Sequence, residues 1–147
     1  MVFLKNLGRA RERFQGLSAP TRAAFVLSIV LIFFWLATTL WFITKEQAEF
    51  LTKLQIDKIM HFAGGIFFAG FVFITSQGTR RSALIGSVFL AGILWEIWEV
   101  IFLPDQLARF RIEFVLWTAD SLFDVAADIL GAYFFYDLSE YGKTLYD

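Results

Sequence analysis

Long apolar runs alternate with short polar stretches along most of the chain. The apolar runs lie at about 23–43, 59–77, 82–103 and 119–136. Each run is close to the roughly 20 residues that a helix needs to cross the hydrocarbon of a bilayer. Because lipid offers no hydrogen-bond partner to an irregular backbone, all of these runs are predicted to be membrane-spanning helices.

The first 22 residues follow a different pattern. Apolar residues recur every three or four positions, as on one face of a helix: Phe3, Leu7, Ala10, Phe14 and Leu17. Basic residues are interspersed among them: Lys5, Arg9, Arg11, Arg13 and Arg22. This pattern predicts a basic amphipathic helix that lies on a membrane surface. The expected fold is therefore an all-α membrane protein with four transmembrane helices after an N-terminal interfacial helix.

The composition excludes an ordinary soluble domain. Of the 147 residues, 58% are hydrophobic and only 18% are charged, with 19 Phe and 5 Trp, whereas soluble domains average about 25% charged residues. The net charge of -1 provides no basic field for nucleic acid, which we do not expect as a partner. Cysteine is absent, so metal or proton chemistry depends on carboxylates and on His61, the single histidine.

The basic residues also predict an orientation. Lys and Arg next to membrane spans stay preferentially in the cytoplasm, and more of them fall on the N-terminal side of the predicted topology than on the other side. We therefore expect a multi-pass protein of the cytoplasmic (inner) membrane. It is divided into a cytoplasmic segment at 1–22, a transmembrane domain at 23–136 and a cytoplasmic tail at 137–147.

Acidic residues occur inside the predicted spans, where a charged side chain costs about 2.5 to 3.5 kcal/mol at the bilayer centre. Three sets share a helix face at spacings of three or four residues: Asp57 with His61, Glu96 with Glu99, and Asp120 with Asp124 and Asp128. In the predicted topology all three sets lie at a similar depth near the outer surface. Crowded carboxylates cannot all remain ionised, so they must take up protons or bind a cation.

A divalent metal ion would suit these side chains, because carboxylate oxygens and one imidazole are ligands of Mg²⁺, Mn²⁺, Ca²⁺ and Zn²⁺. The candidate ligands are Asp57, His61, Glu96, Glu99, Asp124 and Asp128. Supporting charges are expected from Lys58, Arg109, Arg111 and Asp120. The alternative is that Asp57 and Asp120 only cap the starts of helices. Close helix packing is expected at Gly64, Gly65, Gly92 and Gly131.

The order of these polar residues resembles the VanZ-like membrane proteins. The matching elements are Asp57-Lys58-x-x-His61-Phe62, Glu96-x-x-Glu99, Arg111 and Asp124-x-x-x-Asp128-x-x-Gly131. The sequence departs from that family's pattern at Glu99, where Gln is usual, and at Asp128, where Asn is usual. The acidic last span is also similar to YjdF-type inner-membrane proteins. The resemblance implies a polar site on a helical membrane fold and a role in the cell envelope linked to glycopeptide resistance.

Three functions remain open at this point. The chain is expected to bind or act on a cell-envelope component, such as a lipid-linked precursor, through a cation held at the polar site. Alternatively, it is a proton or cation pathway component, or a structural or assembly subunit that contacts other membrane subunits. The substrate, and whether the chain is an enzyme, stay undetermined.

Overall fold

The fold of this chain is a bundle of helices. In the computed structural model, residues 2–41, 56–76, 80–102 and 104–144 are described. For residues 2–7, 35–41, 104–106, 109 and 141–144 of these, only the backbone is described. The helices are α1 (Val2–Gly16), α2 (Ala19–Trp41), α4 (Ile56–Thr75), α5 (Arg81–Phe102), α6 (Pro104–Ile112) and α7 (Phe114–Thr144). No strand occurs in the described ranges, so the all-α prediction is confirmed there.

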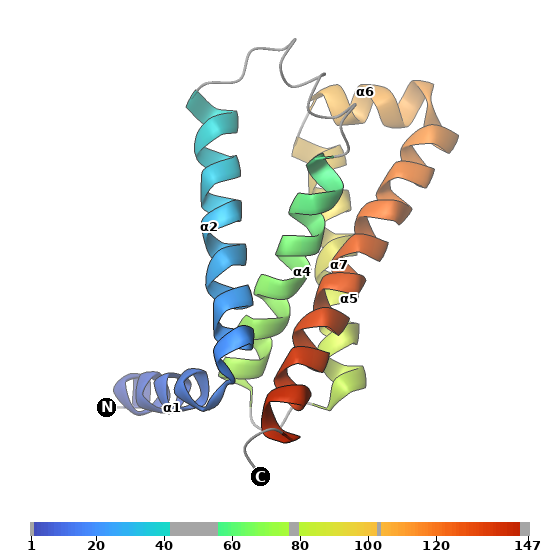
Figure 1. The fold of residues 1–147 in the computed structure, drawn as a ribbon. Helices are drawn as coiled ribbons and strands as arrows, with labels where there is room; N and C mark the ends of the chain where they lie inside the picture. Colours follow the sequence, from blue (N-terminus) through green and yellow to red (C-terminus); the bar gives the residue numbers. More distant parts are fainter. Residues whose placement is uncertain (1, 42–55, 77–79, 103, 145–147) are drawn as a thin grey trace.

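The four long helices stand side by side and alternate in direction along the chain (Figure 1). Helices α4 and α7 both begin at the end of the bundle where α6 lies, and therefore run parallel to each other, whereas α2 and α5 run the opposite way. Helix α1 lies across the other end, where α7 finishes. Residues that follow the starts of α4 and α7 are thus placed at the same end of the bundle as the second half of α5.

The corner between α1 and α2 is fixed by local hydrogen bonds. Ser18 precedes the first residue of α2, and its hydroxyl accepts a hydrogen bond from the Thr21 amide at 3.3 Å, as an N-cap does. From α1, the Arg13 guanidinium donates hydrogen bonds to the carbonyls of Ile74 and Ser76 at the end of α4. Leu17 is buried in the core. The amphipathic helix is therefore attached to the bundle as well as being suited to a membrane surface.

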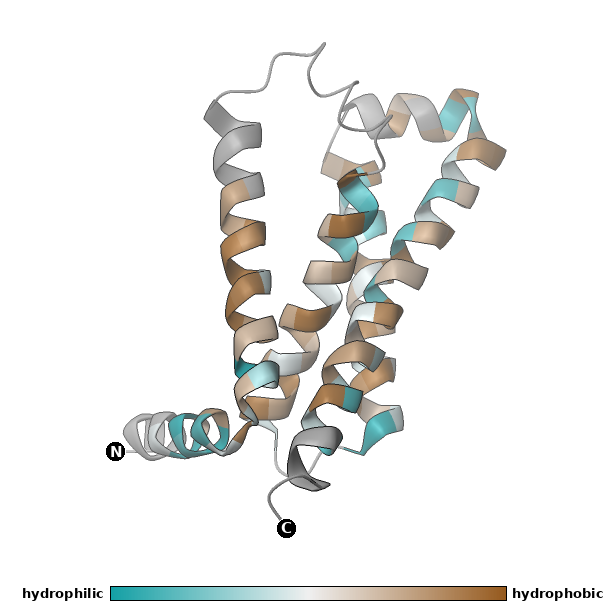
Figure 2. Cartoon of the chain, viewed as in Figure 1, coloured by the Kyte–Doolittle hydropathy of each residue, from teal (hydrophilic) through white to brown (hydrophobic). Residues whose placement is uncertain are grey.

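Two helices, α4 and α5, are long and apolar enough to cross a membrane. A third span is counted if α1 and α2, which meet at a bend of 119°, are taken as one broken span. Figure 2 shows mostly apolar residues along α4 and α5, whereas hydrophilic residues recur along the first half of α7. The prediction of four spans is thus supported for two or three, and α7, which carries three Asp residues in its first half, does not qualify by composition.

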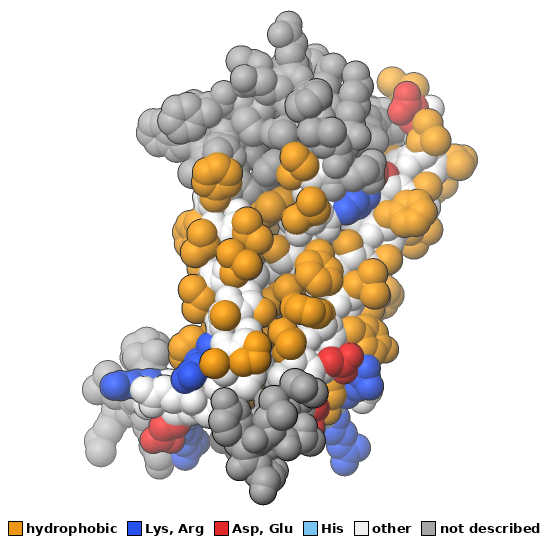
Figure 3. All heavy atoms as spheres, in the orientation of Figure 1, with side chains coloured by type: hydrophobic (Ala, Val, Ile, Leu, Met, Phe, Trp, Pro, Cys, Tyr) orange, Lys and Arg blue, Asp and Glu red, His pale blue; other side chains and the backbone are white. Residues whose placement is uncertain are grey.

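The outward face of the bundle is apolar. Phe33, Leu90, Phe123 and Leu130 each expose more than half of their surface, and Figure 3 shows hydrophobic side chains over most of the visible face between the charged ends. A water-soluble monomer rarely presents so much continuous apolar surface. The exposed face is instead what the hydrocarbon of a bilayer solvates.

Glycines allow α4 and α7 to pack with little space between their backbones. A Cβ atom at Gly65 would collide with the Asp128 carbonyl, and one at Gly131 would collide with the Phe62 carbonyl. Helix α5 approaches the same point, since a Cβ at Gly92 would lie 2.8 Å from Asp128 Oδ2. Short side chains in membrane helices permit this kind of close approach, and here it brings three helices together around Asp128.

Several element boundaries differ from those expected from hydropathy. The last helix begins at Phe114 and continues to Thr144, so it includes residues placed before the span and in the tail. Residues Pro104–Ile112 form a short helix of their own, which starts with proline at its first position. Hydropathy marks apolar length, whereas backbone hydrogen bonding continues the helix into polar sequence. The polar connector at 44–56 falls almost entirely outside the described residues.

Candidate functional site

Most of the predicted polar residues meet at one end of the bundle, among α4, α5 and α7. The sequence spacing explains this. Lys58 and His61 are one turn apart on α4, and Asp124 and Asp128 are one turn apart on α7. Because the two helices run parallel, the residues pair at two successive levels, Lys58 with Asp124 and His61 with Asp128.

Lys58 occupies the outer level, where it is the cation among three carboxylates. Its ammonium lies 2.6 Å from Asp124 Oδ1, 2.7 Å from Asp120 Oδ1 and 3.2 Å from Asp57 Oδ2. An ammonium has three N–H donors, so these contacts use all of them. Asp57 lies in the first turn of α4, as a capping role predicts. Asp120 lies six residues after the start of α7, so the capping prediction is wrong for this residue. Both carboxylates take part in the ion-pair cluster around Lys58.

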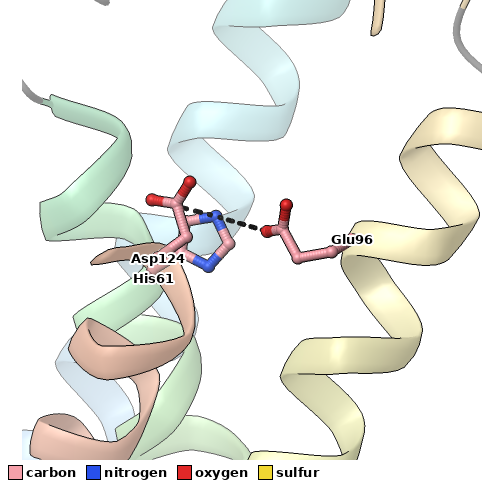
Figure 4. Close-up of side chains that lie close together, drawn as sticks. All are labelled: His61, Glu96 and Asp124. Atoms are coloured by element: carbon pink, nitrogen blue, oxygen red, sulfur yellow. Dashed lines mark ion pairs between the residues drawn. The ribbon is translucent and has the colours of Figure 1, made fainter. Parts of the chain in front are cut away.

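His61 occupies the inner level and connects all three helices. Its Nδ1 lies 3.2 Å from Asp128 Oδ2. Its other nitrogen, Nε2, lies 3.7 Å from Asp124 Oδ1 and 4.0 Å from Glu96 Oε1. Figure 4 shows Glu96 reaching from α5 toward His61 and Asp124. Both distances from Nε2 exceed those of a hydrogen bond, which is made at about 2.7 to 3.2 Å.

Glu96 is a buried carboxylate, as are Asp124 and Asp128. Its side chain is 9% exposed, and its Oε1 is buried without a hydrogen-bond partner among the described atoms. The carboxyl group has a hydrogen bond with Ser121 on α7. A buried polar oxygen without a partner costs about 1 to 3 kcal/mol, and more for a charged group. The oxygen that points to His61 and Asp124 therefore needs a proton or a cation.

His61, Glu96 and Asp124 have the spacing of a metal site. Two ligand atoms that each lie about 2.1 Å from a zinc ion are roughly 3.4 Å apart at the tetrahedral angle, and can be no more than about 4.2 Å apart. The distances of 3.7 and 4.0 Å from His61 Nε2 fall within that range. The three ligand atoms all lie within 4.8 Å of one another, so a small side-chain movement would close them around an ion.

The contact between His61 Nδ1 and Asp128 has a known use in metal sites. A histidine that binds metal through one nitrogen commonly donates its other N–H to a carboxylate, which fixes the ring and raises its basicity. With Nδ1–H donating to Asp128, Nε2 presents a lone pair toward Glu96 and Asp124. Asp128 thus positions the histidine rather than joining the group of close ligand atoms.

Other predicted residues lie apart from this group. Glu99 Oε1 accepts a hydrogen bond of 2.8 Å from Trp95 Nε1, and the described metal-compatible groups do not include it. Arg111 is exposed, and its supporting role stays a prediction. The side chain of Arg109 lies outside the described residues. Among the described side chains, Lys58 is the basic residue that forms ion pairs with carboxylates of the site.

The sequence analysis did not assign site roles to Ser121 and Trp95. Ser121 lies three residues before Asp124, so the same helical spacing that grouped the acids could have placed it on their face. Trp95 lies four residues before Glu99, which is also a pairing distance on a helix. Both residues supply a neutral hydrogen-bond donor to a carboxylate, which stabilises the carboxylate without removing its charge.

No known protein family, curated protein or solved structure matches this chain. The residues themselves therefore carry the functional argument.

Proposed function

We propose that this chain is an integral membrane protein that binds one divalent cation through His61, Glu96 and Asp124. The observation that carries the proposal is Glu96 Oε1, which is buried without a partner and lies 4.0 Å from His61 Nε2. A bound cation would satisfy this oxygen and offset the repulsion between the Glu96 and Asp124 carboxylates. Burial by three different helices also gives the ion a structural effect, because it would join α4, α5 and α7.

The ligand set favours a borderline cation such as Zn²⁺ or Mn²⁺ over Mg²⁺ or Ca²⁺. Imidazole is a good ligand for Zn²⁺, and carboxylates accept both Zn²⁺ and Mn²⁺, whereas Ca²⁺ prefers a set of six to eight oxygen ligands. Three protein ligands also leave a coordination position for water or for a ligand, as in catalytic zinc sites. The site would then act on, or hold, a group that reaches the membrane surface.

We also propose the membrane arrangement that goes with this site. Helix α7 is the fourth span: its exposed Leu122, Phe123 and Leu130 suit contact with lipid, while Asp124 and Asp128 are buried on its other face. Both ends of the chain lie in the cytoplasm of an inner-membrane protein, and the site opens to the other side. From the VanZ-like resemblance we propose a cell-envelope component, such as a lipid-linked precursor, as the partner.

Metal analysis of the purified protein tests the proposal. The protein in detergent should retain about one equivalent of Zn²⁺ or Mn²⁺ after loading and desalting, and a chelator should lower its melting temperature. Glu96→Gln should abolish both effects, because the amide removes the anionic ligand with little change of shape. Glu113→Gln is the matched control, since Glu113 is exposed and lies between α6 and α7.

Two results together would overturn the metal proposal: no stoichiometric metal after loading, and a melting temperature that does not respond to chelator. That outcome would favour the structural alternative, in which Lys58 and its carboxylates hold α4 and α7 in register. Glu96→Gln would then leave the melting temperature near that of the unmodified protein.

A further inference from the structure

The cation site and the Lys58 cluster share one atom. Asp124 Oδ1 accepts the 2.6 Å contact from Lys58 Nζ and is also the oxygen that lies 3.7 Å from His61 Nε2. An ion bound by His61, Glu96 and Asp124 would therefore be only one carboxylate oxygen away from a fixed ammonium. Since both are positive, each weakens the hold of the other on Asp124.

The ammonium of Lys58 also lies within a second group of carboxylates that is compatible with a metal ion. The oxygens of Asp57, Asp120 and Asp124 lie within 4.8 Å of one another, which is also compatible with a metal ion. The ammonium of Lys58 contacts all three. It therefore occupies the position that a second ion would need, while Asp57 Oδ1 is left buried without a hydrogen-bond partner.

We infer that Lys58 is a built-in competing cation that limits the site to one metal ion and weakens its affinity. This inference rests on the proposed metal function and concerns its regulation. When the ion binds at His61 and Glu96, Lys58 keeps Asp57 and Asp120 as partners and gives up part of its contact with Asp124. The ammonium stays in the cluster, so the outer carboxylates keep one compensating positive charge in both states.

The test compares metal binding by Lys58→Met with binding by Lys58→Arg. Methionine has nearly the length of lysine but no charge, whereas arginine keeps the charge. In titrations with Mn²⁺ or Zn²⁺, Lys58→Met should bind two ions per chain and bind the first roughly tenfold or more tightly, because the competing charge is gone. Lys58→Arg should bind one ion, as the unmodified chain does.

A second substitution shows where the extra ion binds. Asp120 belongs to the outer group of carboxylates and not to the inner one, so Asp120→Asn in the Lys58→Met background should return the count to one. Glu96→Gln in the same background should remove the inner ion and leave the outer one. A single ion in Lys58→Met, with unchanged affinity, would overturn the inference.

The metal function and the competing role of Lys58 would fail with different experimental results. If the unmodified chain binds one ion that requires Glu96 and Lys58→Met adds none, the metal function stands and the role of Lys58 is wrong. If the unmodified chain binds none and Lys58→Met binds one that requires Asp120 alone, the inner site is wrong but Lys58 does exclude an ion. Should Lys58→Met unfold in chelator, Mn²⁺ or Zn²⁺ should restore its melting transition, and lack of restoration also overturns the inference.

Discussion

Replacing Gly65 by alanine tests whether close contact between α4 and α7 builds the site. A Cβ at this position would lie 2.7 Å from the Asp128 carbonyl carbon and 2.8 Å from its Cα. Nonbonded carbon atoms are comfortable at about 3.5 to 4.0 Å, and the Asp128 carbonyl oxygen lies closer still to the added Cβ. The two helices must therefore separate by at least about 1 Å. Backbone atoms cannot rotate away as a side chain can, so we expect the full cost of overpacking, about 1 to 3 kcal/mol.

Gly86→Ala is the matched control on α5. Nothing lies within 4 Å of a Cβ built at Gly86, so this substitution changes only helix propensity, which favours alanine by about 0.5 to 1 kcal/mol. Gly65→Ala gains the same propensity term. The difference between the two variants therefore isolates the steric cost.

Thermal unfolding in detergent, followed by tryptophan fluorescence, measures this difference. One kcal/mol corresponds to roughly 2 to 4 °C in a chain of this size, so Gly65→Ala should melt several degrees below Gly86→Ala. It should also bind metal more weakly, because the displaced Asp128 is the partner of His61 Nδ1. A melting temperature for Gly65→Ala equal to or above that of Gly86→Ala would refute the packing argument.

Three further predictions concern the hydrophobic core, the corner between α1 and α2, and the membrane topology. Phe135→Ala removes a side chain with 0% exposure and should lower the unfolding free energy by about 3 to 5 kcal/mol; Phe123→Ala, at a position 68% exposed, should change the melting temperature little. Arg13→Ala removes the hydrogen bonds to the carbonyls at the end of α4 and should speed chymotryptic cleavage after Leu17, between α1 and α2; unchanged cleavage would argue against this attachment. In this chain without cysteine, Glu113→Cys should react with an impermeant maleimide in intact cells and Ser82→Cys only after permeabilisation; the reverse pattern would invert the topology.

Sequence spacing grouped residues that the structure also places close together, because helical periodicity is local. The interval from Asp124 to Asp128 places both carboxyls on one face of any helix, whatever the helix packs against. The pairing of these residues with Lys58 and His61 depends instead on the contact between α4 and α7, which are not consecutive in the chain. No local pattern specifies that contact, so the roles of Lys58 as main cation and Asp128 as histidine partner required the structure.

The length of an apolar run predicts whether a helix can cross a membrane, but it does not predict where that helix begins and ends. Apolar length identified α4 and α5 as spans, because hydrocarbon thickness sets a simple requirement on composition. It set the limits of the last helix at 119–136 although that helix runs over Phe114–Thr144, since polar residues at either end can continue helical hydrogen bonding. Arg111 was assigned a supporting role from its charge and from the VanZ-like pattern. Its side chain is exposed, and neither its charge nor its place in the pattern specifies the direction in which the side chain points.

The burial of the polar residues distinguishes a closed site from a pathway across the bundle. Exposure of the side chains falls from 30% at Asp120 to 16% at His61 and 9% at Glu96, so the polar group is open at one end and closes inward to Asp128. Farther along the bundle interior, the described core is mostly apolar: Leu17, Ile66, Ala69, Leu84, Val88, Ala132 and Phe135. The buried polar residues described there carry only hydroxyl groups: Thr21, Ser28 and Ser139. A charge moving beyond Asp128 would cross this packed layer without a titratable partner among these residues, at the high cost of an unpaired ion in a low-dielectric interior. The arrangement therefore favours an ion that enters and leaves by the same end over one that is conducted through.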